Sequence, residues 1–153
     1  MKINDLPKKI KGLPKAMADM IDKGIIENKD FIKQANIQQM QEHGIRSDES
    51  SLGEYAQYTI ERKKEKGQPY DHVTLHDTGR FHEKMYVKKE KMNLVETYNS
   101  YSSEFTIGSK DKKEVMLIRE WGSDIFGLTP MNMKTLSVRI LPVIKKLLTG
   151  YWK

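Results

Sequence analysis

The first third of the chain has apolar residues at helical spacing. After Pro14, which suits the first turn of a helix, they recur every three or four positions and predict helix as far as residue 43. The polar stretch 28–30 is a candidate restart, so one helix and two helices both fit. Gly44 supplies the left-handed residue that commonly follows a helix end. The apolar positions are Met17, Met20, Ile21, Ile25, Phe31, Ile32, Ala35 and Met40.

The middle of the chain changes to the alternation that is typical of strands. A polar loop is predicted at residues 45–54, followed by a short lysine-rich helix at residues 55–66 that ends at Gly67. The predicted strands are residues 73–75, 84–91, 94–98 and 103–108. We therefore expect an α+β fold: an antiparallel β-meander of about three to five strands, packed against an N-terminal helical segment and a C-terminal amphipathic helix.

The last third is predicted to be mainly helical. Residues 111–122 form an apolar run closed by glycine, for which helix is the first interpretation and strand the alternative. Thr129-Pro130 gives an N-cap followed by proline in the first turn, and the best amphipathic pattern of the chain follows it. Pro142 interrupts this pattern and costs roughly 3 kcal/mol, so we expect a kink or a split near Leu141. Gly150 is predicted to end the helix.

These patterns divide the chain into three parts. Residues 1–13 contain Pro7 and four lysines, and they are predicted to be an extended basic arm that a partner orders. Residues 14–150 are predicted to form a single α+β domain, as the length of 153 residues favours. Residues 151–153, with sequence Tyr-Trp-Lys, remain as an aromatic C-terminal tail.

Composition narrows the class of protein. Apolar residues make up 37% and charged residues 31% of the chain, so we expect a modest core and a strongly solvated surface. Mean hydropathy is −0.70 and no apolar run approaches the ~18 residues of a spanning helix, so no membrane contact is expected. The first residues have no apolar signal segment, and the absence of cysteine excludes disulfides and thiolate metal sites. Synthesis in a cytoplasm is consistent with all of this.

The net charge of +6, with a pI near 9.3, permits contact with nucleic acid or with an acidic protein. The lysine runs at residues 63–66 and 88–91 are each interrupted by glutamate, which is typical of a solvated face. A contact with DNA is the alternative interpretation of these runs. Its candidate DNA-facing residues are Lys63, Lys64, Lys88 and Lys89, with Arg62, Lys66 and Lys91 beside them.

Histidines do not predict a metal site. His72 and His76 are four residues apart, but they flank the predicted strand 73–75. Four strand residues span about 13 Å. Zinc needs ligand atoms about 2 Å from one centre, so this pair would not share an ion.

The sequence gives equally little support for a nuclease, a phosphate-binding loop or a serine hydrolase. Asp77 with residues 111–113 matches the letters of a Mg²⁺-dependent nuclease, D…D-x-K, but such matches arise by chance in a chain with 27 Lys/Arg and 21 Asp/Glu. Asp111 also stands at a predicted helix start, where an acidic residue is favourable. Glycine-rich phosphate loops and the G-x-S-x-G motif are absent. We expect no catalytic residues, no cofactor and no metal, and hence no enzyme.

A tight turn and several aromatic residues are candidates for subunit contacts. In the segment Thr78-Gly79-Arg80-Phe81, Asp77 and Thr78 are expected to bond the local backbone, while Gly79 takes a positive φ. The further aromatic candidates are Phe126, Tyr151 and Trp152, whereas Trp121 is assigned to the core because it closes an apolar helix.

The order of these motifs resembles that of tail-completion, or virion morphogenesis, proteins of tailed bacteriophages. Over roughly residues 28–148 the chain has an N-terminal helix, a polar loop, a lysine-rich helix, a T-G-x-F turn, strands, an aromatic patch and a last helix. The matching residues are Tyr55, Tyr58, Thr59, Lys63, Lys64, Gly67, Leu75, Thr78, Gly79, Phe81, Trp121, Gly122, Ile125, Phe126, Gly127, Leu128 and Thr129. The segment 119–122 departs from the His-Gln-Phe-Gly or Tyr-Ala-Pro pattern of many such proteins.

The resemblance implies a structural component of the virion, made in the host cytoplasm and placed at the head–tail junction. Such a neck, adaptor or tail-terminator protein forms a homo-oligomeric ring by a heterologous interface that closes. Its neighbours would be portal, neck and tail proteins, and DNA in the channel would be touched without sequence preference. The rival hypotheses are a basic nucleic-acid-binding module and, with less support, a Mg²⁺-dependent nuclease.

Overall fold

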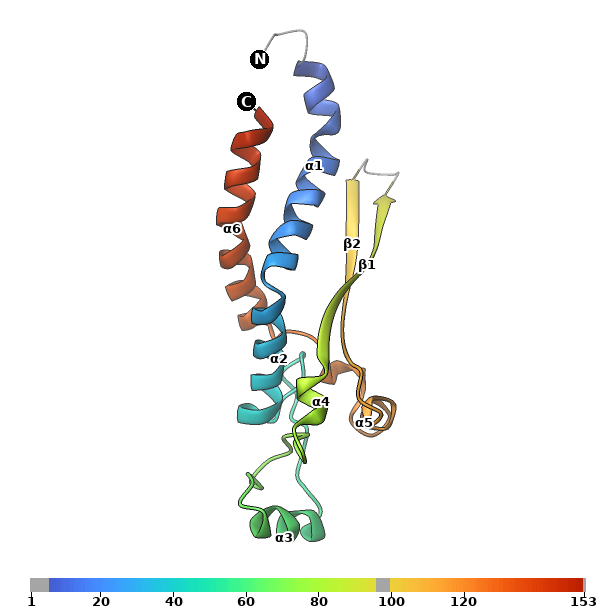
Figure 1. The fold of residues 1–153 in the computed structure, drawn as a ribbon, viewed down its shortest axis with the longest axis vertical. Coiled ribbons are helices and arrows are strands. Elements are labelled where there is room, and N and C mark those ends of the chain that lie inside the picture. Colours follow the sequence, from blue (N-terminus) through green and yellow to red (C-terminus); the bar gives the residue numbers. More distant parts are fainter. Residues whose placement is uncertain (1–5, 96–99, 153) are drawn as a thin grey trace. The chain divides into compact units, whose positions relative to one another are not determined.

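The protein is an α+β protein, as predicted, with one two-stranded sheet in the part of the chain that is described here. The computed structural model describes residues 6–95 and 100–152 (Figure 1). The helices are α1 (Leu6–Glu27), α2 (Lys29–His43), α3 (Gln57–Glu65), α4 (Arg80–Glu83), α5 (Glu114–Trp121), the 3₁₀ helix η3 (Ser123–Ile125) and α6 (Pro130–Trp152). The strands are β1 (Met85–Val95) and β2 (Ser100–Ser109), which pair with each other.

The predicted meander of about three to five strands is not found in the described residues. The expected strands 84–91 and 94–98 join in the single long strand β1, residues 96–99 lie outside the described part, and 103–108 belong to β2. Residues 73–75 lie in no strand. Leu75 has φ +51°, which is incompatible with an extended strand, and the N–H of Thr74 donates to the Tyr55 hydroxyl instead of to a neighbouring strand.

The N-terminal helix is longer than predicted. Because α1 begins at Leu6, residues 6–13 are helical, whereas an extended arm was predicted there. The interpretation as two helices is confirmed: α1 ends at Glu27, and the Asn28 side-chain amide donates to the carbonyl of Gly24 at 2.9 Å. Gly44, directly after α2, has the expected positive φ of +59°.

The C-terminal helices settle two alternatives. Residues 114–121 are helical, so the helix interpretation of the 111–122 run is correct. Helix α6 runs without a break from Pro130 to Trp152 and contains Pro142, so the split expected near Leu141 does not occur. Gly150 does not end the helix, and Tyr151 and Trp152 belong to it instead of to a separate tail.

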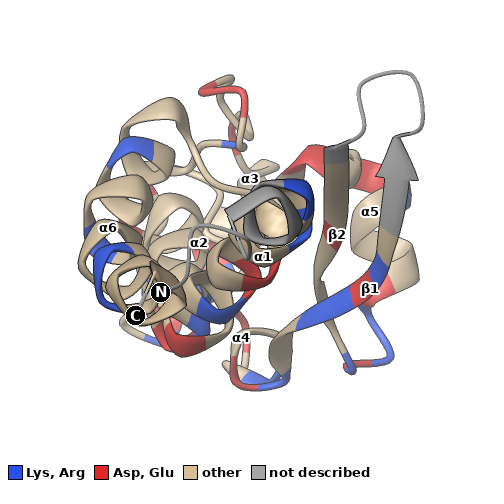
Figure 2. Ribbon diagram, turned by 90° about the horizontal axis from the view of Figure 1, so that it is seen from above, with Lys and Arg blue, Asp and Glu red and all other residues tan. Residues whose placement is uncertain are grey.

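The chain divides into two compact units, and the segment 14–150, predicted to be a single domain, contributes to both. Unit 1 comprises residues 1–30, 88–106 and 134–153, and unit 2 comprises residues 31–87 and 107–133. Lysine and arginine are spread over several helices and β1 (Figure 2). No helix in the described part is both long and apolar enough to cross a membrane.

In unit 1, helix α1 lies between α6 and the β1–β2 sheet (Figures 1 and 2). The helices approach closely at Gly24, where an added Cβ would overlap the side chain of Ile140. On the other side, buried Asp22 pairs with Lys89 of β1 at 2.5 Å and accepts a hydrogen bond from the Ser103 hydroxyl at 2.8 Å. The helix therefore covers the sheet through a buried polar contact.

Unit 2 has the main hydrophobic core. Its buried members come from α2, the loops, α4, β1, α5 and η3; they are Met40, Leu52, Val73, Phe81, Met85, Leu117 and Ile125. Trp121 packs against this cluster with part of its ring exposed, which agrees with its assignment to the core.

Two buried amides of α2 fix the loop that precedes α6. Asn36 donates to the carbonyl of Ile125 at 3.0 Å, and Gln39 donates to the carbonyl of Gly127 at 3.0 Å. The Gln39 carbonyl oxygen accepts from the N–H of Thr129 at 3.0 Å and from the Asn132 amide at 2.7 Å. These bonds satisfy backbone groups that burial would otherwise leave unpaired.

Candidate binding site

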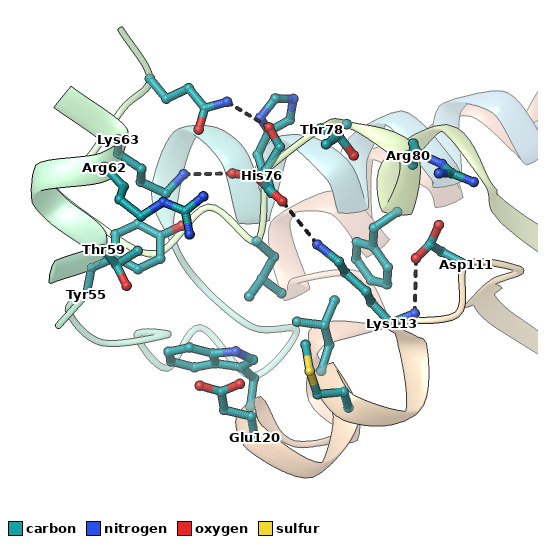
Figure 3. Close-up of a pocket in the computed structure, with 18 of the residues that line it drawn as sticks. Tyr55, Thr59, Arg62, Lys63, His76, Thr78, Arg80, Asp111, Lys113 and Glu120 are labelled. Atoms are coloured by element: carbon teal, nitrogen blue, oxygen red, sulfur yellow. Dashed lines mark hydrogen bonds and ion pairs between the residues drawn. The ribbon is translucent and has the colours of Figure 1, made fainter. Parts of the chain in front are cut away.

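Unit 2 contains a pocket of about 450 Å³ between α3, α5 and the segment that leads into α4 (Figure 3). Its positively charged lining residues are Arg62, Lys63, Lys66, Arg80 and Lys113, and its carboxylates are Asp77, Asp111 and Glu120. The apolar and aromatic lining residues are Tyr55, Tyr58, Leu75, Phe81, Met116, Leu117 and Trp121. The pocket therefore combines an excess of two positive charges, five minus three, with an apolar surface.

The wall formed by α3 is anchored by a buried lysine. The ammonium of Lys63 donates to the backbone carbonyl of His76 at 2.7 Å and lies 3.5 Å from the Thr74 hydroxyl. It also lies 4.8 Å from the ring centroid of Tyr55, whose hydroxyl accepts from the N–H of Thr74 at 2.8 Å. Within the described residues, the acceptors of this buried cation are neutral.

Asp77 joins the two sides of the pocket. Its carboxylate accepts a hydrogen bond from Lys66 at 2.9 Å and another from Lys113 at 3.1 Å. These two hydrogen bonds lower the pKa of Asp77 to about 2. The side chain of Asp77 therefore bonds two lysines, whereas a bond to the local backbone was predicted.

The predicted turn adjoins the pocket. Gly79 has the expected positive φ of +80° and directly precedes α4. Phe81 points into the core, so it is buried within unit 2 and unavailable as an exposed contact residue. Thr78 and Arg80 are exposed and line the pocket.

The residues considered for a nuclease come together at the pocket, where lysines lie beside both carboxylates. Asp77, Asp111 and Lys113 all line the pocket. Both oxygens of Asp77 are occupied by lysine ammonium groups, and Asp111 lies 3.6 Å from Lys84. No group of three or more His, Asp or Glu side chains suited to a metal occurs in the described part.

The four lysines proposed to face DNA each have a partner inside their own unit. Lys63 is buried, and the Lys64 ammonium lies 4.8 Å from the ring centroid of Tyr70. Lys88 pairs with Glu90 at 2.9 Å, and Lys89 pairs with buried Asp22. A phosphate contact would have to compete with these interactions.

The remaining aromatic candidates are half-buried. The ring of Phe126 lies 5.9 Å from that of Phe81 in unit 2. In unit 1, Tyr151 and Trp152 meet edge to face at 5.5 Å, and an added Cβ on Gly12 would lie 3.2 Å from the Tyr151 hydroxyl. Tyr151 therefore packs beside α1.

The sequence analysis did not predict that His82 is buried. Its Nδ1 lies 3.0 Å from the Gln41 amide nitrogen and its ring stacks on His76, while its buried Nε2 has no hydrogen-bond partner in the described structure. Burial lowers the pKa of His82 to about 4. In the sequence, the available signal is its place directly after the apolar residue Phe81, three residues beyond Gly79.

Comparison with known proteins adds no relative. No family model, no curated protein and no solved structure matches this chain. The resemblance to phage tail-completion proteins therefore rests on the short motifs described above.

Proposed function

We propose that this chain is a structural subunit of a tailed-phage virion, in a neck, adaptor or tail-terminator ring at the head–tail junction. It acts by oligomeric assembly with copies of itself and with neighbouring portal, neck or tail proteins, and it performs no catalytic step. The motif order supports the virion assignment, and the surface of unit 1 supports the assembly.

The observation on which the proposal depends is an uncovered apolar face of α6. Leu136 is the one side chain of this helix that is buried in the described structure. Val138 and Leu141 are 61% and 49% exposed, and their spacing of three residues places them together on the side of the helix away from Leu136. A helix with apolar residues on two sides is stabilised when both sides are buried. Helix α1 packs on one side of α6, and we expect another subunit to bury the other side.

The β1–β2 sheet gives a second reason to expect neighbours. A two-stranded sheet is marginally stable by itself, and its outer edges carry unpaired backbone groups. Strand β1 has Lys88, Lys89 and Lys91, which discourage pairing at its edge, whereas β2 has no lysine. Strand addition at the β2 edge by another chain is a common route to assembly.

Mass measurement of the full chain tests the proposal. Native mass spectrometry and sedimentation should show a closed oligomer of fixed mass that Val138→Glu and Leu141→Glu shift towards monomer by at least about tenfold in concentration. Lys146→Gln is the matched control, because it lowers the net charge by one, as the glutamate variants do, at an exposed position of the same helix. It should leave assembly unchanged.

A second measurement tests the case in which the subunit assembles only on a partly built virion. Proteomic analysis of purified particles from the phage that encodes the chain should find it in stoichiometric amounts. A chain that stays monomeric at every accessible concentration and is missing from mature particles would overturn the proposal.

A further inference from the structure

The pocket of unit 2 has more positive charge than its own carboxylates neutralise. Asp77 is already bonded to Lys66 and Lys113, and Asp111 to Lys84. Among the described residues, Arg62, Lys63 and Arg80 form no ion pair with a carboxylate. Arg62 and Arg80 are exposed, so an incoming anion can reach them, whereas the buried ammonium of Lys63 already donates to the His76 carbonyl.

These cations lie on opposite sides of an apolar floor. In Figure 3, Arg62 and Lys63 extend from α3 on one side, whereas Arg80 and Lys113 lie on the other. The floor is formed by Leu75, Phe81 and Leu117. A ligand that fits both features has an anionic group beside an apolar one.

The buried ammonium of Lys63 strengthens the case for an anion. A charged group that is taken out of water is costly unless it is paired, and the neutral acceptors of Lys63 repay only part of that cost. An anion at the mouth of the pocket would strengthen this arrangement, because the attraction between charges increases where water is excluded.

The rim indicates what kind of molecule brings the anion. Tyr58 and Met116 line the pocket and are 68% and 51% exposed, so a small ligand would leave much of their apolar surface in water. A nucleic acid fits poorly, because Asp77, Asp111 and Glu120 would repel successive phosphates. A peptide can place its carboxylates next to the cations and direct its own N–H groups towards these acids.

We infer that this pocket binds an acidic peptide segment of another protein, with one large apolar side chain inserted between α3 and α5 and flanking carboxylates on Arg62 and Arg80. The inference does not depend on ring formation, because the pocket belongs to unit 2 and the assembly surface of α6 belongs to unit 1. If the peptide does not bind, the proposed assembly through α6 is unaffected, and if the chain does not assemble, the peptide inference is unaffected.

Trp121 provides the readout. The chain has two tryptophans, so Trp152→Phe leaves Trp121, in the pocket wall, as the single tryptophan, which light of about 295 nm or longer excites without the tyrosines. The probes are blocked hexapeptides with two Asp or Glu residues around one Phe, Leu or Met, each compared with its Asn/Gln counterpart. The acidic members should change Trp121 fluorescence and bind at least about tenfold more tightly than their neutral counterparts.

Charge-removal variants locate the contact. Arg62→Gln and Arg80→Gln should each weaken peptide binding about tenfold or more, while circular dichroism shows an unchanged fold, since both side chains are exposed. Lys112→Gln removes an exposed charge beside the pocket but outside its lining, and it should leave binding unchanged.

Three results would overturn the inference. One is that no acidic hexapeptide binds more tightly than its neutral counterpart. Another is that inorganic phosphate or Mg²⁺ alone perturbs Trp121 at concentrations below those needed for the peptides. The third is that oligothymidylate competes with all of them, which would assign the pocket to nucleic acid.

Discussion

The ammonium of Lys63 lies 2.7 Å from the backbone carbonyl oxygen of His76, and this contact ties α3 to the segment that leads into α4. Lys63 belongs to a lysine-rich run that, as a sequence, is typical of a solvated face. Its neighbour Lys64 is exposed, as that pattern predicts. One turn of helix thus contains both a surface lysine and a buried structural lysine. The Tyr55 ring lies beside the Nζ of Lys63 and stabilises the buried ammonium.

Lys63→Met should lower the free energy of unfolding by about 1–3 kcal/mol. Methionine fills similar space but leaves the His76 carbonyl without its donor. In the Trp152→Phe background, urea titration followed by Trp121 fluorescence measures the change in unit 2. Lys64→Met is the control, because it removes an exposed contact with the Tyr70 ring and should cost less than about 1 kcal/mol. Equal effects from the two variants would contradict the structural role of Lys63.

Gln39→Ala should destabilise unit 2 by about 2–4 kcal/mol. The amide of Gln39 makes three hydrogen bonds to residues 127–132, and its loss leaves buried groups of that loop unpaired. Gln38→Ala removes an exposed amide on the same helix that bonds the Glu42 side chain, and it should be nearly neutral. Hydrogen exchange at Thr129 provides a local test, because its N–H should lose protection in Gln39→Ala and keep it in Gln38→Ala.

His82 should make stability fall as the solution becomes mildly acidic. Its pKa is about 4 in the folded chain against 6.5 for a free side chain, so between these values the unfolded state binds a proton that the folded state does not. The contribution of His82 to the free energy of unfolding is therefore fully present above about pH 6.5. It is lost towards pH 4, which lowers the stability by up to roughly 3 kcal/mol. His82→Phe should flatten this dependence, and His43→Gln, at an exposed position, should not. Urea titrations between pH 4 and 7.5 measure it, and identical slopes for wild type and His82→Phe would refute the assignment.

Gly24→Ala should destabilise unit 1 by about 1–3 kcal/mol although alanine favours helix. The added methyl would overlap the Ile140 side chain, and the cost of this overpacking exceeds the gain of about 1 kcal/mol in helix propensity. Gly150→Ala, where an added Cβ meets nothing within 4 Å, should instead be neutral or stabilising. Thermal unfolding monitored by circular dichroism compares the two. A stabilised Gly24→Ala would show that α1 and α6 do not pack at this point.

Local sequence determined where several helices lie and some of their ends. The helix that precedes Gly67 and the left-handed glycines Gly44 and Gly79 were predicted correctly, and the restart near Asn28 was one of two alternatives that the sequence left open. These features depend on apolar spacing, capping and backbone freedom within a few residues, so the chain itself contains the information. The strand at 103–108 was found for the same reason, because its alternation is local.

Tertiary contacts decided the rest. Val73 to Leu75 has the composition of a strand, yet the Tyr55 hydroxyl takes the N–H of Thr74, and Leu75 adopts a positive φ. The burial of Lys63, the contact of His82 with Gln41 and the pocket itself likewise depend on residues that are eleven or more positions apart in the sequence. Periodicity shows which side of a segment is apolar but not which segment will meet it, because that choice minimises the free energy of the whole packed unit.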